Sequence, residues 1–212
     1  LIYMYDMIFF TTACLSVDSL KFLVLGDWGG LPTYPYHTSI ETGVAKQMGM
    51  VADKYQSEFI LALGDNFYYD GVKDVNDHRF KETYEDVFTA KSLYIPWYLV
   101  AGNHDHNGNV SAQIAYSKKS NRWKYPDYYY SMSYDVPGGK KAEFVMIDTV
   151  LLCGNTGHDF LNNQPQGPDN LGVADAQWDW INKQLQTSSA DYLIVAGHFP
   201  VYSIAEHGPT KC

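Results

Sequence analysis

Short apolar runs alternate with amphipathic segments along this chain. Four of the runs have the length and composition of buried strands, and they cover Phe22–Leu25, Phe59–Leu63, Trp97–Val100 and residues 192–195. Three segments between them carry apolar residues at helical spacing, and we expect each of these stripes to face the core. The stripes consist of Val44, Met48, Val51, Ala52 and Tyr55, then Phe80, Tyr84, Val87 and Phe88, and finally Trp178, Ile181 and Leu185.

A different pattern lies between the third and fourth strands. Residues 128–136 and 142–147 flank Pro137, Gly138 and Gly139, which predicts an antiparallel hairpin. Residues 162–170 contain two prolines and a glycine, so we expect a loop there. Together these elements predict an α/β (α+β) fold with one core over residues 17–212.

Composition restricts the class of partner. The chain has 212 residues, with 15 Lys and Arg against 24 Asp and Glu, and a formal net charge of -9. Such a chain has too few cations to follow a nucleic-acid backbone, so we expect no nucleic-acid partner. An anionic substrate would need metal ions or local histidines to receive it.

The N-terminal segment, residues 1–16, is apolar and is interpreted as the later part of a secretory signal. Asp6 and the absence of a basic leader depart from that pattern, and a divergent N-terminal strand is the alternative. The segment is too short and too interrupted to span a bilayer, so we expect no stable membrane insertion.

The cysteines agree with export. Removal of Cys14 with the signal leaves Cys153 and Cys212, an even pair suited to one disulfide in an oxidising compartment. Asn109 begins an Asn-Val-Ser sequon for N-glycosylation in a polar loop. We therefore expect a secreted or lysosomal glycoprotein.

Each of the four apolar runs ends in a glycine-led block with a metal-binding side chain. The side chains are Asp27 in the first block, Asp65 and Tyr68 in the second, Asn103 in the third and His198 in the fourth. Ligands bind at the carboxyl ends of strands in open α/β sheets. The four blocks therefore predict one site.

The residue types indicate two metal ions. Two cations about 3.5–4 Å apart need a shared anionic oxygen, and Asp65 is the natural bridge. Asp27 would bind one ion, while Asn103 and His198 would bind the other. Tyr68 is a hard anionic donor when ionised and favours a trivalent ion such as Fe(III) on the Asp27 side.

Each residue also has an ordinary interpretation when it is taken alone. An aspartate after a glycine is common turn or helix-cap chemistry. A single histidine is more often a surface or hydrogen-bonded residue than a ligand, and we assign four histidines to that class: His37, His78, His106 and His158. The metal interpretation depends on the ordered set of four blocks, each behind a strand.

The chain closely resembles the mammalian-type purple acid phosphatases, also called tartrate-resistant acid phosphatases, of the metallophosphoesterase superfamily. The resemblance runs from about Lys21 to Cys212 and extends outside the blocks, through residues 101–106, 109–118 and 203–210. It implies a four-layer αββα sandwich. Tyr68 is specific to this group among related two-metal enzymes.

The resemblance also implies roles for individual residues. Residues matching Asp27, Asp65 and Tyr68 hold Fe(III), and those matching Asp65, Asn103 and His198 hold Fe(II) or Zn(II). His104 and His207 match histidines that orient the phosphate and protonate the leaving group. Cys153 and Cys212 match a disulfide pair, and Asn109 matches a glycosylated position.

One family block, a Gly-His-x-His that gives each metal a further imidazole, does not occur before Cys212. We therefore expect this chain to be a piece of a longer enzyme, with the sandwich incomplete at its C-terminus. For the complete protein we expect a monomeric acid phosphatase acting on phosphate monoesters, either small molecules or phosphoproteins. The alternatives are an inactive secreted glycoprotein of this fold, or a related metallophosphodiesterase or nucleotidase.

Overall fold

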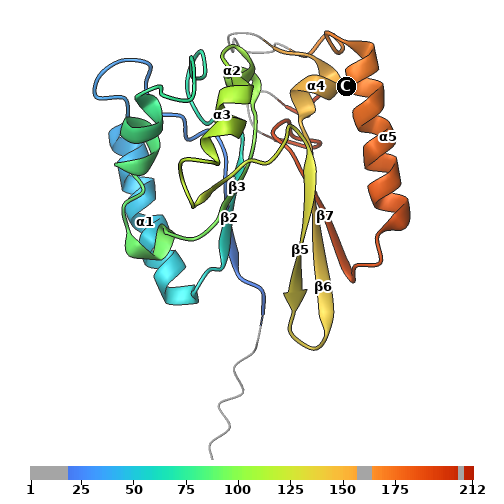
Figure 1. Ribbon diagram of the computed structural model, residues 1–212, viewed down its shortest axis with the longest axis horizontal. Coiled ribbons are helices and arrows are strands. Elements are labelled where there is room, and N and C mark those ends of the chain that lie inside the picture. Colours follow the sequence, from blue (N-terminus) through green and yellow to red (C-terminus); the bar gives the residue numbers. More distant parts are fainter. Residues whose placement is uncertain (1–18, 157–163, 205–207) are drawn as a thin grey trace, which may run out of the picture.

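The computed structural model describes residues 19–156, 164–204 and 208–212, and it shows two β-sheets packed between two outer helices (Figure 1). Helix α1 (Ser39–Tyr55) lies outside the first sheet, and helix α5 (Leu171–Thr187) lies along the outer face of the second. This arrangement confirms the αββα sandwich. Residues 1–16, interpreted above as part of a secretory signal, lie outside the described residues. His158 and His207 do so too.

The first sheet is parallel and has the strand order β1-β2-β3-β4. Its strands are β1 (Phe22–Leu25), β2 (Phe59–Leu63), β3 (Trp97–Val100) and the short β4 (Trp123–Lys124). The first three strands have the predicted bounds. Because they run in one direction, their carboxyl ends meet at one edge of the sheet.

The second sheet has the order β5-β6-β7, with strands β5 (Tyr130–Val136), β6 (Lys140–Met146) and β7 (Tyr192–Ala196). Strands β5 and β6 are antiparallel, which confirms the hairpin, and Gly138 and Gly139 at its turn have positive φ angles of 84° and 73°. Strand β7 runs parallel to β6. Residues 164–170, the described part of the expected loop, form no helix or strand.

Aromatic side chains join the two sheets. The ring of Phe59 in β2 stacks on Phe22 in β1 at 4.9 Å and on Tyr134 in β5 at 4.3 Å, and it meets the edge of Phe144 in β6 at 5.3 Å. These rings are apolar surface removed from water on both inner faces. The inner core therefore fixes how the two sheets face each other.

The opposite face of the first sheet carries a second aromatic core. Trp28 lies at its centre, 5.7 Å from the ring of Tyr84, 5.8 Å from Trp97 and 6.2 Å from Trp123. Trp28 directly follows Asp27, so packing of the indole fixes the start of the loop that leaves β1. The shorter helices are η1 (Phe80–Glu85), η2 (Lys91–Leu93), α2 (Asn103–His106), α3 (Val110–Tyr116) and α4 (Thr149–Cys153).

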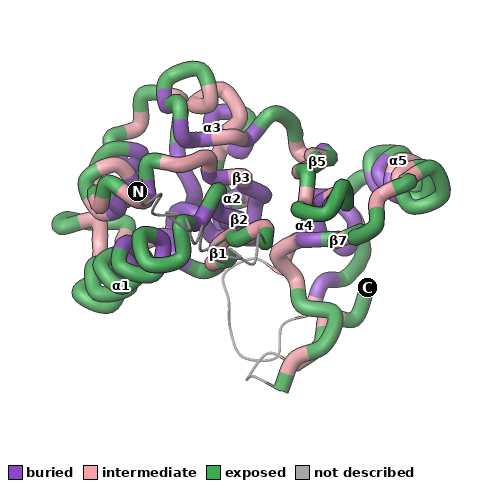
Figure 2. The backbone as a smooth tube through the Cα atoms, turned by 90° about the horizontal axis from the view of Figure 1, so that it is seen from below, coloured by how far each residue is buried: buried purple, intermediate pink, exposed green. Residues whose placement is uncertain are grey.

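The prediction that all the apolar stripes face the core was wrong in part for α1 and α5. Ala52 and Ile181 are buried as expected and Met48 packs against the core, but the other members are not covered. Val44, Val51 and Tyr55 of α1 are exposed, as are Trp178 and Leu185 of α5. Much of the tube of both helices has the colour of exposed residues in Figure 2. The buried face of α1 consists of Glu41, Ala45, Gly49 and Ala52, so it shares only Ala52 with the predicted stripe. A Cβ at Gly49 would lie 2.5 Å from Ala90 Cβ, so close approach of the η2 segment selects small residues on this face.

Two predicted buried strands are also more exposed than expected. Strands β1 and β7 are edge strands, and Val24, Tyr192 and Val195 are exposed while the central strand β2 is buried. An edge strand has a neighbour on one side only, which leaves its surface less covered. Among the described residues, no helix combines the length and apolar composition needed to cross a membrane.

Candidate metal centre

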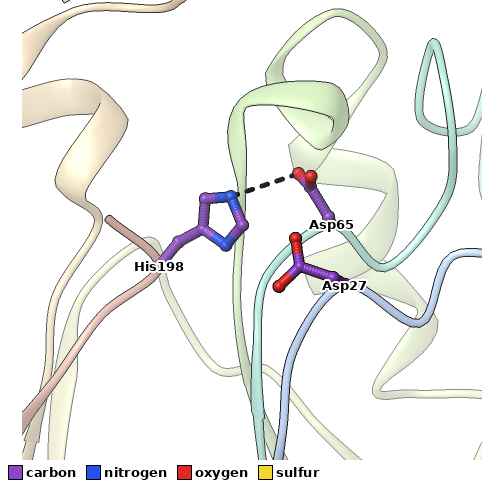
Figure 3. A group of neighbouring side chains, drawn as sticks. All are labelled: Asp27, Asp65 and His198. Atoms are coloured by element: carbon purple, nitrogen blue, oxygen red, sulfur yellow. Dashed lines mark ion pairs between the residues drawn. The ribbon is translucent and has the colours of Figure 1, made fainter. Parts of the chain in front are cut away.

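The four glycine-led blocks meet at the carboxyl edge of the first sheet. Asp27 follows β1, Asp65 follows β2, helix α2 with Asn103 follows β3, and His198 reaches the same place from the end of β7 (Figure 3). The Asp27 amide donates to the Gly64 carbonyl at 3.1 Å, so the first two blocks are joined through their backbones. The structure thus brings together the predicted metal ligands.

The two aspartates adopt a backbone conformation that non-glycine residues seldom take. Asp27 has φ 56° and Asp65 has φ 51°, both in the left-handed region. Such residues cost roughly 1–3 kcal/mol each and persist only where the surroundings hold them, commonly at functional sites. Aspartate is among the non-glycine residues that take this conformation most readily, so local preference and the surroundings both favour these turns.

Asp65 lies at the centre of the site and is 1% exposed. Its Oδ1 accepts a hydrogen bond from the His104 amide at 3.1 Å, whereas its buried Oδ2 has no hydrogen-bond partner among the described residues. Burial raises the pKa of Asp65 from 3.8 to about 6, and the positive charge that His198 can carry opposes this rise. A buried carboxylate oxygen without a donor is the kind of atom that a cation satisfies.

A backbone carbonyl fixes the orientation of the His198 ring. Its Nδ1 lies 2.8 Å from the Leu63 carbonyl, and since a carbonyl only accepts, Nδ1 carries the hydrogen. Nε2 then lies 3.1 Å from Asn103 Oδ1 and 3.5 Å from Asp65 Oδ1. These three electron-pair donors need a cation among them, either a proton on Nε2 or a metal ion. The carbonyl contact also fixes the ring and its tautomer, as in metal-binding histidines.

Tyr68 and Asp27 form the other side of the site. The Tyr68 hydroxyl donates to Asp27 Oδ1 at 3.1 Å. Burial, followed by the charges of Asp27 and Asp65, raises the pKa of Tyr68 well above its ordinary value. The phenol therefore stays protonated unless a bound cation offsets these carboxylates, because a metal ion inverts the local pKa relations.

The donor set fits the two metal ions that the resemblance implies. Ligand atoms of Asp27, Asp65 and His198 all lie within 4.8 Å of one another. On the Tyr68 side the donors are hard oxygens, which suit Fe(III), and on the His198 side they are an imidazole, an amide and a carboxylate, which suit Zn(II) or Fe(II). The unpartnered Oδ2 of Asp65 lies in a position to complete this set.

His104 is buried beneath this group, at 1% exposure. Its Nδ1 donates to the Tyr69 carbonyl at 2.8 Å, its Nε2 lies 3.9 Å from Asp65 Oδ2, and its ring meets Tyr68 edge to face at 4.8 Å. The structure therefore places His104 beside the candidate metal ligands. His207, its expected partner, lies outside the described residues.

Sequence reasoning missed Asp105, which is fully buried below the ligands. Its Oδ2 accepts from the amides of Gly102 at 2.9 Å and Asn66 at 3.0 Å, and its Oδ1 accepts from Gln113 Nε2 at 2.7 Å. It thereby joins the second block to the third. Its place directly after Asn103 and His104 was the available signal, but the contact with residue 66 is not visible in the sequence.

Other predicted features fall outside the metal group. His106 binds Asp148 Oδ2 at 2.7 Å and His78 is exposed beside Glu82, which agrees with their assignment as hydrogen-bonded or surface residues. The Cys153–Cys212 disulfide is present. Asn109 caps helix α3 by accepting from the Ala112 amide, and its glycosylation stays a prediction.

Comparisons with known proteins agree with this geometry. Residues 20–212 match the family model described as calcineurin-like phosphoesterase. The chain is 53% identical to tartrate-resistant acid phosphatase type 5 of Rattus norvegicus, over 92% of this chain and 60% of the relative. It is 33% identical to purple acid phosphatase 4 of Arabidopsis thaliana, over 91% of this chain and 55% of the relative.

A solved structure also matches. "GAP50 the anchor in the inner membrane complex of Plasmodium" has a TM-score of 0.76 and 29% identity, and the match covers 91% of this chain and 59% of that chain. The sequence and structure matches confirm the resemblance to the purple acid phosphatases and the sandwich fold. The chain spans about three fifths of the length of the type 5 acid phosphatases that it matches.

Proposed function

The chain belongs to the calcineurin-like phosphoesterase family, and we propose that the complete protein acts as an acid phosphatase on phosphate monoesters at a centre of two metal ions. The observation that carries this proposal is the convergence of His198 Nε2, Asn103 Oδ1 and Asp65 Oδ1, together with the buried Oδ2 of Asp65. These atoms come from the ends of three separate strands, and together they form a donor set that suits a metal ion.

When bound, the metal ions would neutralise phosphate charge and provide a hydroxide at acidic pH. Asp65 would hold both ions, because its carboxylate lies close to the ligand atoms of both Asp27 and His198. Asn103 and His198 would hold the divalent ion, and Asp27 and Tyr68 the trivalent one. We assign Fe(III) to the Tyr68 side and Fe(II) or Zn(II) to the other, on the donor chemistry of each side.

His104 would serve the phosphate. Since its Nδ1 is occupied by the Tyr69 carbonyl, Nε2 is the atom directed toward the site. When both ring nitrogens carry a proton, Nε2–H would donate to a phosphoryl or leaving-group oxygen. We propose His207 as a second donor by its match to the family. An acidic optimum follows from both assignments.

The fold alone does not establish this activity. The Plasmodium protein that shares the fold is described as an anchor, and folds of this kind serve several functions. The presence of the candidate metal ligands, rather than the fold, is what supports an enzyme over an inert protein of the same fold. We also propose a secreted or lysosomal location, supported by the Cys153–Cys212 disulfide, since such bonds persist in oxidising compartments.

The test is hydrolysis of p-nitrophenyl phosphate and of bis(p-nitrophenyl) phosphate by the purified protein at pH 5 and pH 7. We expect the monoester to be preferred and the rate to be higher at pH 5. His198→Ala should abolish hydrolysis, whereas the matched control His78→Ala, at an exposed histidine, should retain it. Preference for the diester would indicate a phosphodiesterase, and no activity in metal-loaded protein would indicate an inert one.

A further inference from the structure

We propose that Arg79 is a positioning residue that holds the loops of Asp27 and Tyr68 in register for metal binding. The inference rests on the proposed function. Arg79 precedes helix η1, lies 50 positions after Gly29 and 11 after Tyr68, and is 5% exposed. Arg79 is not one of the proposed metal ligands, so it would act on the site through the backbone of the two loops.

The guanidinium of Arg79 connects the two loops directly. Its Nη2 donates to the Gly29 carbonyl, two residues after Asp27, and its Nη1 donates to the Tyr68 carbonyl. The Tyr68 amide in turn donates to the same Gly29 carbonyl at 3.0 Å. One planar group thus spans the loop after β1 and the loop after β2.

The position of the guanidinium is itself fixed. Its Nε contacts Thr83 Oγ1 at 3.4 Å, and the Thr83 hydroxyl donates to the Tyr36 carbonyl at 2.8 Å. The guanidinium also lies over the Phe67 ring at 5.4 Å. Hydrogen bonds from a charged donor are stronger than neutral ones, so a buried arginine is well suited to hold two carbonyls at a set separation.

The loops that carry Asp27 and Tyr68 depend on contacts with other parts of the chain for their positions. Asp27 is exposed and has a left-handed backbone, so few contacts of its own side chain keep it in place. The loops are also in backbone contact, because a Cβ at Gly29 would lie 2.6 Å from the Tyr68 amide nitrogen. A shift of one loop therefore moves the other, and the Asp27–Tyr68 pair with it.

The experiment compares Arg79→Lys with Arg122→Lys in the purified, iron-loaded protein. Arg122 is a matched control, since it is 6% exposed and its guanidinium also bonds to a carbonyl, that of Phe88, and to Glu85. A lysine can reach one of the two loop carbonyls but cannot span both. We expect both variants to lower the melting temperature of the metal-free protein.

Only Arg79→Lys should affect the Tyr68 side of the site. We expect about 10–100-fold weaker iron retention against a chelator, the range for residues that support metal ligands. We also expect a shifted or weakened tyrosinate absorption per bound iron. If Arg79→Lys does not fold, Thr83→Val, which removes the acceptor for Nε, should show the same changes at smaller amplitude.

The outcomes separate the two proposals. A wild-type protein that binds no iron and shows no tyrosinate absorption overturns the proposed function. A coloured wild-type protein whose Arg79→Lys and Arg122→Lys variants retain iron equally, with the same spectrum, overturns the role of Arg79. Selective loss of iron and colour in Arg79→Lys supports it.

Discussion

Gly102→Ala is expected to damage the site by steric contact alone. Gly102 joins β3 to α2 and has φ -101° and ψ -177°, an extended conformation that alanine adopts readily. An added Cβ, however, would lie 2.2 Å from Asp65 Oδ1 and 2.4 Å from the Asp65 amide nitrogen. The perturbation therefore falls on the proposed bridging ligand.

The magnitude follows from this distance. Ordinary carbon contacts lie at about 3.5 Å or more, so Asp65 and α2 must separate by about 1 Å. A displacement of this size in a catalytic site costs about 100-fold in rate, which corresponds to about 2.7 kcal/mol. Overpacking should also lower the free energy of unfolding by about 1–3 kcal/mol.

The assay is kcat/KM for a phosphate monoester together with the number of metal ions bound per chain. The matched control is Gly43→Ala in helix α1, where an added Cβ meets no atom within 4 Å. Alanine is the better helix former by about 1 kcal/mol, so the control should be fully active and slightly more stable. Wild-type turnover and metal content in Gly102→Ala would refute the reasoning.

Three further predictions concern Asp65, Asp105 and the disulfide. In metal-free protein, the raised pKa of Asp65 makes the native state bind more protons than the unfolded state between about pH 4 and 6. The free energy of unfolding should therefore fall as pH rises through this window, and urea titrations of Asp65→Asn should lack that fall. The Asp105 carboxylate accepts hydrogen bonds from Gly102, Asn66 and Gln113, and Asp105→Asn replaces one of its oxygens with an NH2 donor. Calorimetry should show a free energy of unfolding lower by about 1–3 kcal/mol, and metal binding should be weaker. Cys212→Ser removes the Cys153–Cys212 disulfide, whose cysteines are 59 residues apart, and should lower the free energy of unfolding in denaturant by about 2–4 kcal/mol with no change in metal content. A loss of bound metal in this variant would contradict the view that the disulfide is separate from the metal site.

The sequence was sufficient to predict strands β1, β2 and β3 and the place where the candidate metal ligands meet. An apolar run followed by a glycine and a ligand is a local pattern, and parallel pairing then brings the ends of such runs together, as seen for Asp27 and Asp65. These parts of the prediction needed no knowledge of distant contacts.

The helix faces could not be predicted in the same way. Hydrophobic periodicity gives the helical repeat in α1, but the buried side was decided by close approach at Gly49, which favours small residues over Val44 and Val51. Arg79 and Asp105 were missed for a related reason. Their partners are backbone groups in other loops, and nothing in the adjacent sequence identifies those groups.

The most direct test of the central claim is the metal content and visible spectrum of the oxidised wild-type protein beside Tyr68→Phe. We propose two metal ions at Asp65, with the Tyr68 phenolate on one of them. We therefore expect two ions per chain in the wild type and in Tyr68→Phe, and a tyrosinate absorption band in the wild type that is absent from Tyr68→Phe. A band that survives in Tyr68→Phe, or a wild-type protein with fewer than two ions, would contradict it.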